Sequence, residues 1–215
     1  MGSYLNPGNF SFRGSLRSKI YVDKSELIAK TNEALCTEQK YICVSRPRRF
    51  GKSMAANMLA AYYDRNENTE ELFQNLAISK DKSYKENLNQ YDVIKINMQE
   101  FLSMSGTVEE MMNMLKNYLV LDFEETYPKV RFRDEKNLIQ VMKDVFSYTK
   151  CPFVILIDEW DCLFREYKQD KDAQKKYLDF LRVWLKDKDY VAMAYMTGIL
   201  PIKKYGSHSA LNMFT

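Results

Sequence analysis

The chain has 215 residues, of which 46% are hydrophobic, and its 32 basic and 29 acidic residues leave a formal charge of +3. This length can bury one substantial core but is too short for two comfortable domains. The balanced charge excludes a protein built mainly as a polycation, so nucleic-acid binding finds no support in net charge.

The four cysteines lie far apart in the sequence and form no close CxxC pair, which argues against a zinc or redox site. They are expected to be reduced thiols packed as small hydrophobic groups. No segment approaches the ~20 apolar residues of a membrane span, and no secretory leader pattern is present. We therefore expect a soluble cytoplasmic protein.

The first nineteen residues mix Asn, Pro, Gly, Ser and Arg without a helical or strand period, which predicts an extended N-terminal arm over 1–19. A short β-like run, Ile20 to Val22, follows it. Asp23, with Glu26 three positions later, has the pattern of a helix N-cap and predicts a helix to about Leu35.

Four compact apolar runs predict strands that are buried on both faces: Tyr41 to Ser45, Tyr91 to Met98, Phe153 to Ile157 and Val191 to Met196. Apolar residues at helical spacing predict helices that start near Ser53, Val108, Leu138 and Tyr177. Strands that alternate with helices predict a three-layer α/β domain with a mainly parallel sheet. Ligands then belong at the carboxyl ends of the strands.

A candidate phosphate-binding loop, SRPRRFGKS from Ser45 to Ser53, lies between the first predicted strand and the helix after it. Gly51, Lys52 and Ser53 have the spacing of the Walker A motif of P-loop proteins, with a glycine turn, an ammonium for the terminal phosphates and a hydroxyl for Mg²⁺. Arg46 replaces the first glycine of that motif. A bare Gly-Lys-Ser is also common as an ordinary helix start; the flanking strand and helix favour the phosphate loop.

The residues around that tripeptide are expected to contact the nucleotide as well. Backbone amides through Met54 would face the phosphates, and Phe50 belongs to the same loop. Arg46 and Arg49 are candidates for phosphate contact because a guanidinium suits bidentate phosphate recognition. The alternative is that these arginines form salt bridges to nearby carboxylates.

Asp158 and Glu159 end the most apolar run and are candidates for Mg²⁺ binding and for activation of the attacking water, respectively. The alternative is that Asp158 caps a helix running from Glu159 to about Tyr167. The predicted strand from Tyr91 to Met98 falls between the two motifs in sequence. This order favours the AAA or ASCE branch of P-loop ATPases, which insert a strand between the motif strands.

Thr197, at the end of the last predicted strand, is a candidate sensor of the γ-phosphate; the alternative is a plain turn residue before Gly198. His208 has no acidic or cysteine neighbour in the sequence, so no metal or catalytic role is expected for it.

Four short runs of the chain carry a resemblance to a known family: YVDKS from Tyr21, SRPRRFGKS from Ser45, IDEWD from Ile157 and TGI from Thr197. Together they resemble the AAA-ATPase-like family of bacteria, in which arginine is usual at position 46 and tyrosine is frequent at position 160. The resemblance implies an ATPase domain over 20–215. It also implies a C-terminal helical lid and a nuclease-like domain of the PD-(D/E)XK type, which are absent from these 215 residues.

The sequence therefore predicts an ATP-binding and Mg²⁺-dependent ATP-hydrolysing module in which Lys52, Glu159 and Thr197 serve the reaction, with Ser53 and Asp158 on the metal. The alternative is a nucleotide-binding switch or scaffold with little turnover that acts through a protein or nucleic-acid partner. Assembly into a homo-oligomer stays open for either function. A phosphotransferase is disfavoured because no acceptor-binding segment is recognisable.

Overall fold

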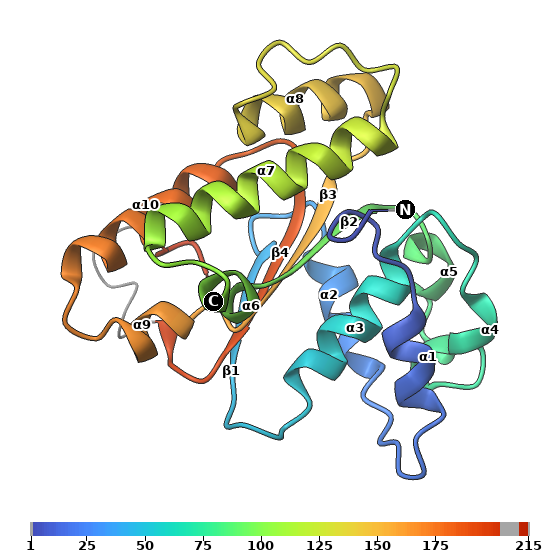
Figure 1. The fold of residues 1–215 in the computed structure, drawn as a ribbon. Helices are drawn as coiled ribbons and strands as arrows, with labels where there is room; N and C mark the ends of the chain where they lie inside the picture. Colours follow the sequence, from blue (N-terminus) through green and yellow to red (C-terminus); the bar gives the residue numbers. More distant parts are fainter. Residues whose placement is uncertain (1, 203–210, 215) are drawn as a thin grey trace.

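The computed structural model describes residues 2–202 and 211–214, so His208 lies outside the described part. Its centre is a four-stranded, all-parallel sheet with the strand order β1-β4-β3-β2 (Figure 1). The strands are β1 Tyr41–Ser45, β2 Asp92–Asn97, β3 Phe153–Asp158 and β4 Val191–Gly198. All four predicted strands are confirmed, as is the parallel sheet.

Both faces of the sheet are buried. In β3, Phe153, Ile155 and Ile157 belong to one hydrophobic cluster, whereas Val154 and Leu156 belong to a second one. Because successive side chains of a strand point to opposite faces, the two clusters are the two interfaces between sheet and helices. The predicted three-layer architecture is confirmed.

One group of helices contributes its buried residues to the first cluster: α6 Met98–Ser103, α7 Val108–Thr126, α8 Leu138–Thr149, α9 Cys162–Glu166 and α10 Lys171–Leu185. The other group contributes to the second cluster: α1 Phe10–Leu16, α2 Glu26–Ala34, α3 Lys52–Tyr63, α4 Glu70–Phe73, the 3₁₀ helix η1 Ala77–Lys80 and α5 Tyr84–Asn87. Figure 1 shows α7 and α10 on one side of the sheet and α1 to α3 on the other. Among the described helices, none combines the length and the apolar character that a bilayer crossing demands.

The order of the strands locates the two motifs. β4 lies between β1, which leads into the candidate phosphate loop, and β3, which ends at Asp158. The strand that separates the motif strands in space is therefore β4, and not the run from Tyr91 to Met98, which forms β2 at the edge of the sheet. The expected insertion is present, but sequence order pointed to the wrong strand for it.

The prediction of an extended arm over 1–19 was wrong for Phe10–Leu16, which form α1. Phe12 of α1 is completely buried and stacks on Phe73 with ring centroids 5.1 Å apart. A helix of seven residues that buries a single aromatic side chain leaves no readable apolar period. The run from Ile20 to Val22 is not a strand, and those two side chains are 83% and 62% exposed.

Asp23 does not cap α2, because the N-cap residue is Ser25. The Asp23 carboxylate instead accepts hydrogen bonds from the backbone N–H groups of Ser25 at 2.8 Å and of Ala77 at 2.7 Å. The second of these bonds reaches η1, across 54 positions of the sequence. A tertiary contact has thus replaced the predicted local cap.

Candidate functional site

All four strands end at one edge of the sheet, where their last residues lie side by side. Asn97 is paired in register with Asp158, and Ser45 with Gly198. This is the edge at which open α/β sheets bind their ligands. The candidate phosphate loop follows β1 here, and the acidic pair follows β3.

The candidate phosphate loop turns sharply between β1 and α3. The Arg46 N–H donates to the Gly198 carbonyl at 3.0 Å, which ties the start of the loop to the end of β4. Arg49 and Gly51 both have left-handed backbones, with φ of 68° and 78°. Gly51 is the N-cap of α3. The unpaired N–H groups of the first helical turn and the positive end of the helix dipole therefore point toward the loop.

Lys52 and Ser53 open α3 and differ strongly in exposure. The Lys52 side chain is folded back over the loop, where its Nζ donates to the Pro47 carbonyl at 3.1 Å and only 8% of the residue is exposed. Ser53 is exposed. On the outer side of the loop, Lys24 Nζ donates to the Phe50 carbonyl at 3.1 Å. The ammonium of Lys52 is thus held by a neutral carbonyl, a contact that a phosphate oxygen can replace.

Asp158 lies at the end of β3 and is 5% exposed. Its Oδ1 accepts hydrogen bonds from the Thr197 hydroxyl on β4 and from the Glu159 N–H, the latter at 3.0 Å. The alternative in which Asp158 caps the next helix is wrong, because α9 begins at Cys162 and its N-cap is Asp161. Burial lowers the pKa of Lys95 on β2, and the charge of Asp158 opposes that effect.

Glu159 has a left-handed backbone, with φ of 54°, and its side chain turns toward α9. There its Oε2 forms an ion pair with Arg165 Nη2 at 2.5 Å. The two side chains are 21% and 17% exposed, so the pair is largely shielded from water. Arg165 Nε lies 3.6 Å from Asp161 Oδ1, and neither of these two buried atoms makes a hydrogen bond.

Asp161 and Trp160 pack tightly against the end of β4. Asp161 Oδ2 accepts the N–H groups of Ile199 at 2.9 Å and Leu200 at 2.7 Å, which fixes the turn after β4. A Cβ on Gly198 would lie 2.7 Å from Trp160 Nε1 and 2.9 Å from Asp161 Cγ. This packing requires glycine at position 198, because the Trp160 indole and the Asp161 carboxyl group leave no space for a side chain.

These elements enclose a cleft of about 560 Å³ at the carboxyl edge of the sheet. The cleft is lined by Arg48, Arg49, Gly51, Lys52, Ser53, Met54, Asn97, Gln99, Glu159, Arg165 and Glu166. Four cationic and two acidic side chains face it, so its electrostatics favour an anionic ligand.

The cleft brings together most of the predicted site residues, including Lys52, Ser53 and Glu159. Thr197 and Asp158 are not among its lining residues, and both are nearly buried. The other two candidates, Arg46 and Phe50, belong to the loop but do not line the cleft.

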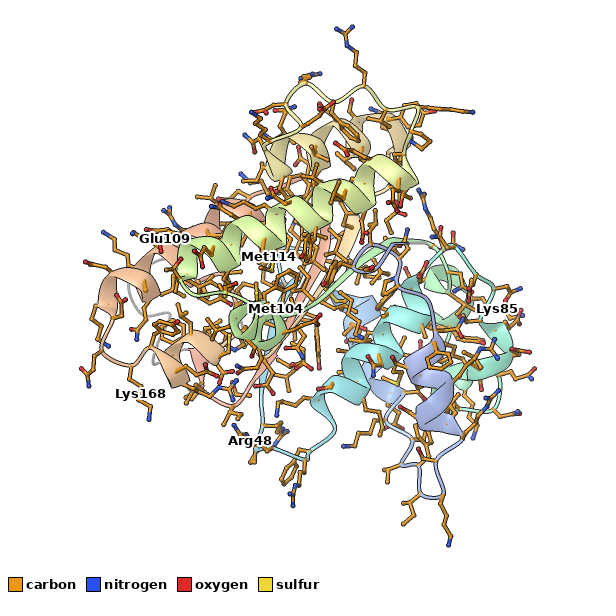
Figure 2. All side chains as sticks on the ribbon, viewed as in Figure 1. Arg48, Lys85, Met104, Glu109, Met114 and Lys168 are labelled. Carbon is orange, nitrogen blue, oxygen red and sulfur yellow. The ribbon has the colours of Figure 1, made fainter. Side chains whose placement is uncertain are left out.

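The three arginines of the loop are exposed, and Figure 2 shows Arg48 extending from the loop between β1 and α3. Within the described residues, Arg46, Arg48 and Arg49 form no salt bridge. The structure therefore does not show the carboxylate pairing that was the alternative role of Arg46 and Arg49.

Residues 12–207 match the model of a family described as predicted AAA-ATPase. The chain belongs to the AAA-ATPase-like family. The match confirms the resemblance drawn from the four sequence runs, and membership suggests nucleotide binding. Neither the curated proteins nor the solved structures yielded a match.

The donor set of this AAA-ATPase-like protein suits Mg²⁺ bound together with phosphates. Mg²⁺ prefers oxygen ligands and usually takes one or two from the protein, with the rest from water and phosphate. The Ser53 hydroxyl and the Asp158 carboxylate are oxygen donors of this kind at the same sheet edge. In residues 2–202 and 211–214, no three His, Cys, Asp or Glu side chains gather into a metal site of their own.

Five residues that line the cleft were not among the predicted site residues: Arg48, Asn97, Gln99, Arg165 and Glu166. Asn97 could have been found, because it is a polar residue close to the end of a predicted strand that shares its edge with Asp158. The side chain of Gln99 accepts from Arg165 Nη2 at 3.3 Å and donates to Glu166 at 2.5 Å. These contacts depend on the fold, and nothing in the local sequence announces them.

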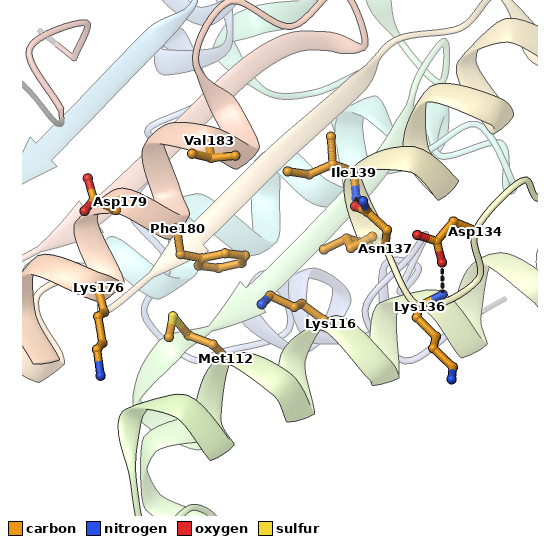
Figure 3. A pocket seen from close by; sticks show the side chains of 11 residues that line it. Met112, Lys116, Asp134, Lys136, Asn137, Ile139, Lys176, Asp179, Phe180 and Val183 are labelled. Carbon is orange, nitrogen blue, oxygen red and sulfur yellow. Dashed lines mark hydrogen bonds between the residues drawn. The ribbon is translucent and has the colours of Figure 1, made fainter.

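A second hollow, of about 640 Å³ and so larger than the cleft, opens between α7, α8 and α10 (Figure 3). Its lining is mainly apolar and includes Phe180, with Lys116 Nζ 5.2 Å above the ring centroid. None of the predicted site residues lines it. Size alone therefore does not identify the functional cleft.

Proposed function

We propose that this protein binds ATP in the cleft at the carboxyl edge of the sheet and hydrolyses it with the help of Mg²⁺. The observation that carries the proposal is that Lys52 and Ser53 on α3 line the same cleft as Glu159 after β3. The excess of cationic side chains in that cleft and membership of the AAA-ATPase-like family support the same conclusion.

Binding of the triphosphate uses the first turn of α3. The N–H groups around Gly51 to Met54 receive phosphate oxygens, and Lys52 exchanges the Pro47 carbonyl for the β- and γ-phosphates. Ser53 and Asp158 would hold Mg²⁺, which would offset charge on the phosphates. Arg49 lines the cleft and serves as a second phosphate contact.

Hydrolysis requires a water molecule aligned with the γ-phosphate. Glu159 orients that water and takes its proton while the water oxygen bonds to phosphorus and the bond to the ADP oxygen breaks. Thr197 donates to Asp158 and so connects the metal-binding carboxylate to β4. The products are ADP and inorganic phosphate.

Titration calorimetry with Mg·ATP tests the binding step. Lys52→Ala should abolish detectable binding, since the ammonium has no substitute at that position of the loop. Lys136→Ala is the matched control, because Lys136 is exposed and lines the second hollow instead. Retained affinity in a folded Lys52→Ala protein would refute the proposal.

A slow nucleotide switch is the second candidate function, and one observation favours it. The Glu159 carboxylate already has one oxygen occupied by Arg165, which leaves it poorly placed to align water. Phosphate release by the pure protein, with and without added DNA, separates the two functions. Glu159→Gln should retain ATP binding and lose phosphate release, whereas Glu109→Gln, in an exposed pair with Lys176, should change neither.

A further inference from the structure

Arg165 lies at the centre of a small network beside the cleft. Its Nη2 donates to Glu159 Oε2 at 2.5 Å and to Gln99 Oε1 at 3.3 Å. Its buried Nε makes no hydrogen bond, although the Asp161 carboxylate is 3.6 Å away. The guanidinium therefore still has a donor that no group in the described structure accepts.

The same guanidinium lines the cleft together with Lys52. A guanidinium presents a planar fork of donors that matches the oxygens of a phosphate, and its charge is permanent. A terminal phosphate in the cleft and the Glu159 carboxylate are both anions, so they compete for one cation. The charge of Arg165 cannot serve both equally well.

We propose that Arg165 is a positioning residue that holds Glu159 in a resting place and releases it when a γ-phosphate takes over the guanidinium. This inference rests on the proposed function, because it concerns the triphosphate in the same cleft. It explains why the acidic residue expected to face water is paired inside its own chain. It also means that Glu159 becomes free to orient water only when the γ-phosphate, which ADP lacks, is bound.

The proposal predicts a specific thermodynamic coupling. Binding of the γ-phosphate must break the Glu159–Arg165 pair, so Glu159→Gln should tighten the affinity for a non-hydrolysable ATP analogue by about tenfold. Arg165→Gln should weaken that affinity by about tenfold, because the guanidinium contact is lost. Affinity for ADP should stay unchanged in both variants.

The double variant separates release from simple repulsion. If Glu159 acts by competing for Arg165, Glu159→Gln should have little effect on analogue affinity once Arg165 is glutamine. If Glu159 merely repels the phosphate, its replacement should help at least as much in the Arg165→Gln protein. The second result would overturn the proposal.

Calorimetry with Mg²⁺ and either the ATP analogue or ADP gives all these values on the full chain. Arg182→Gln is the matched control, since Arg182 pairs with Asp179 at the exposed surface of α10 and should leave both affinities unchanged. Should Arg165→Gln fail to fold, Glu159→Gln alone still tests the proposal, because an unchanged ratio of analogue to ADP affinity would overturn it. Absence of any nucleotide binding by the unaltered protein would instead refute the proposed function.

Discussion

The two ends of the sheet hold arginine–carboxylate clusters of opposite character. At the amino end of β2, the carboxylate of the fully buried Asp92 accepts three hydrogen bonds. The donors are the Arg65 Nε at 3.0 Å, the Asn6 amide at 2.8 Å and the Tyr127 hydroxyl at 2.6 Å. At the carboxyl end, Arg165 faces two carboxylates, yet its Nε makes no hydrogen bond. The first cluster is saturated, whereas the second retains donors and acceptors.

The difference shows where the protein can respond to a ligand. A buried carboxylate that has several well-placed partners contributes stability and leaves nothing for a ligand to bind. An incompletely satisfied cluster is less stable by itself but can exchange partners at low cost. The presence of an arginine and a carboxylate does not by itself distinguish the clusters, because both contain such a pair.

Loss of the saturated cluster should have the largest effect on stability. Asp92→Ala leaves Arg65 without its ion pair and Asn6 and Tyr127 without their acceptor, so it should lower the free energy of unfolding by about 3–5 kcal/mol. Urea denaturation followed by circular dichroism measures this change.

Asp179→Ala is the control for that experiment. It breaks a pair whose partners are both 44% exposed, and it should cost about 1 kcal/mol or less. Equal losses for Asp92→Ala and Asp179→Ala would mean that the two kinds of pair do not differ in the way the structure indicates.

A smaller loss of stability is expected from adding a side chain at Gly198, which packs closely against Trp160 and Asp161. Gly198→Ala should lower the free energy of unfolding by about 1–3 kcal/mol, because its Cβ would displace Trp160 or Asp161. It should also weaken Mg·ATP binding, since Asp161 neighbours Arg165. Thermal unfolding and calorimetry give the two readouts.

Gly14→Ala is the matched control because nothing lies within 4 Å of its added Cβ. Gly14 is inside α1, so alanine should stabilise the protein by about 0.5–1 kcal/mol. If both substitutions stabilise the protein, the tight packing at the end of β4 is not required.

Long periodic elements could be predicted from the sequence, and short ones could not. The strands and α3, α7, α8 and α10 each show a readable apolar period, and the meeting of Lys52 with Glu159 follows from strand ends that share an edge. The short helices, of seven residues or fewer, offer too few turns for such a period. Three of them, α1, α4 and α5, bury one aromatic side chain each.

The partners of site residues were the least predictable part. The pairing of Glu159 with Arg165 depends on a left-handed backbone at Glu159, which is uncommon for glutamate and leaves no trace in the sequence. Asp23 was misassigned for a related reason, because its carboxylate bonds to Ala77 from a distant segment. Local sequence patterns indicate which interactions a side chain can make, whereas the tertiary structure determines the partner with which it makes them.

Asp23 should produce the smallest of the three effects and shows a third way to satisfy a carboxylate. Burial raises its pKa, but hydrogen bonds from the Ala77 and Ser25 backbones outweigh burial and lower the pKa below its ordinary value. The stability that Asp23 contributes is therefore present above about pH 4 and is lost as the pH falls through the lowered pKa.

Asp23→Asn should reduce the acid sensitivity of the melting temperature below pH 4 and leave the melting temperature at pH 7 slightly lower. Because Asp23 anchors the segment from which Lys24 reaches the Phe50 carbonyl, Mg·ATP affinity should fall by a few-fold at most. Loss of binding as large as that expected for Lys52→Ala would show that this exposed carboxylate, rather than the Arg165 cluster, controls the phosphate loop.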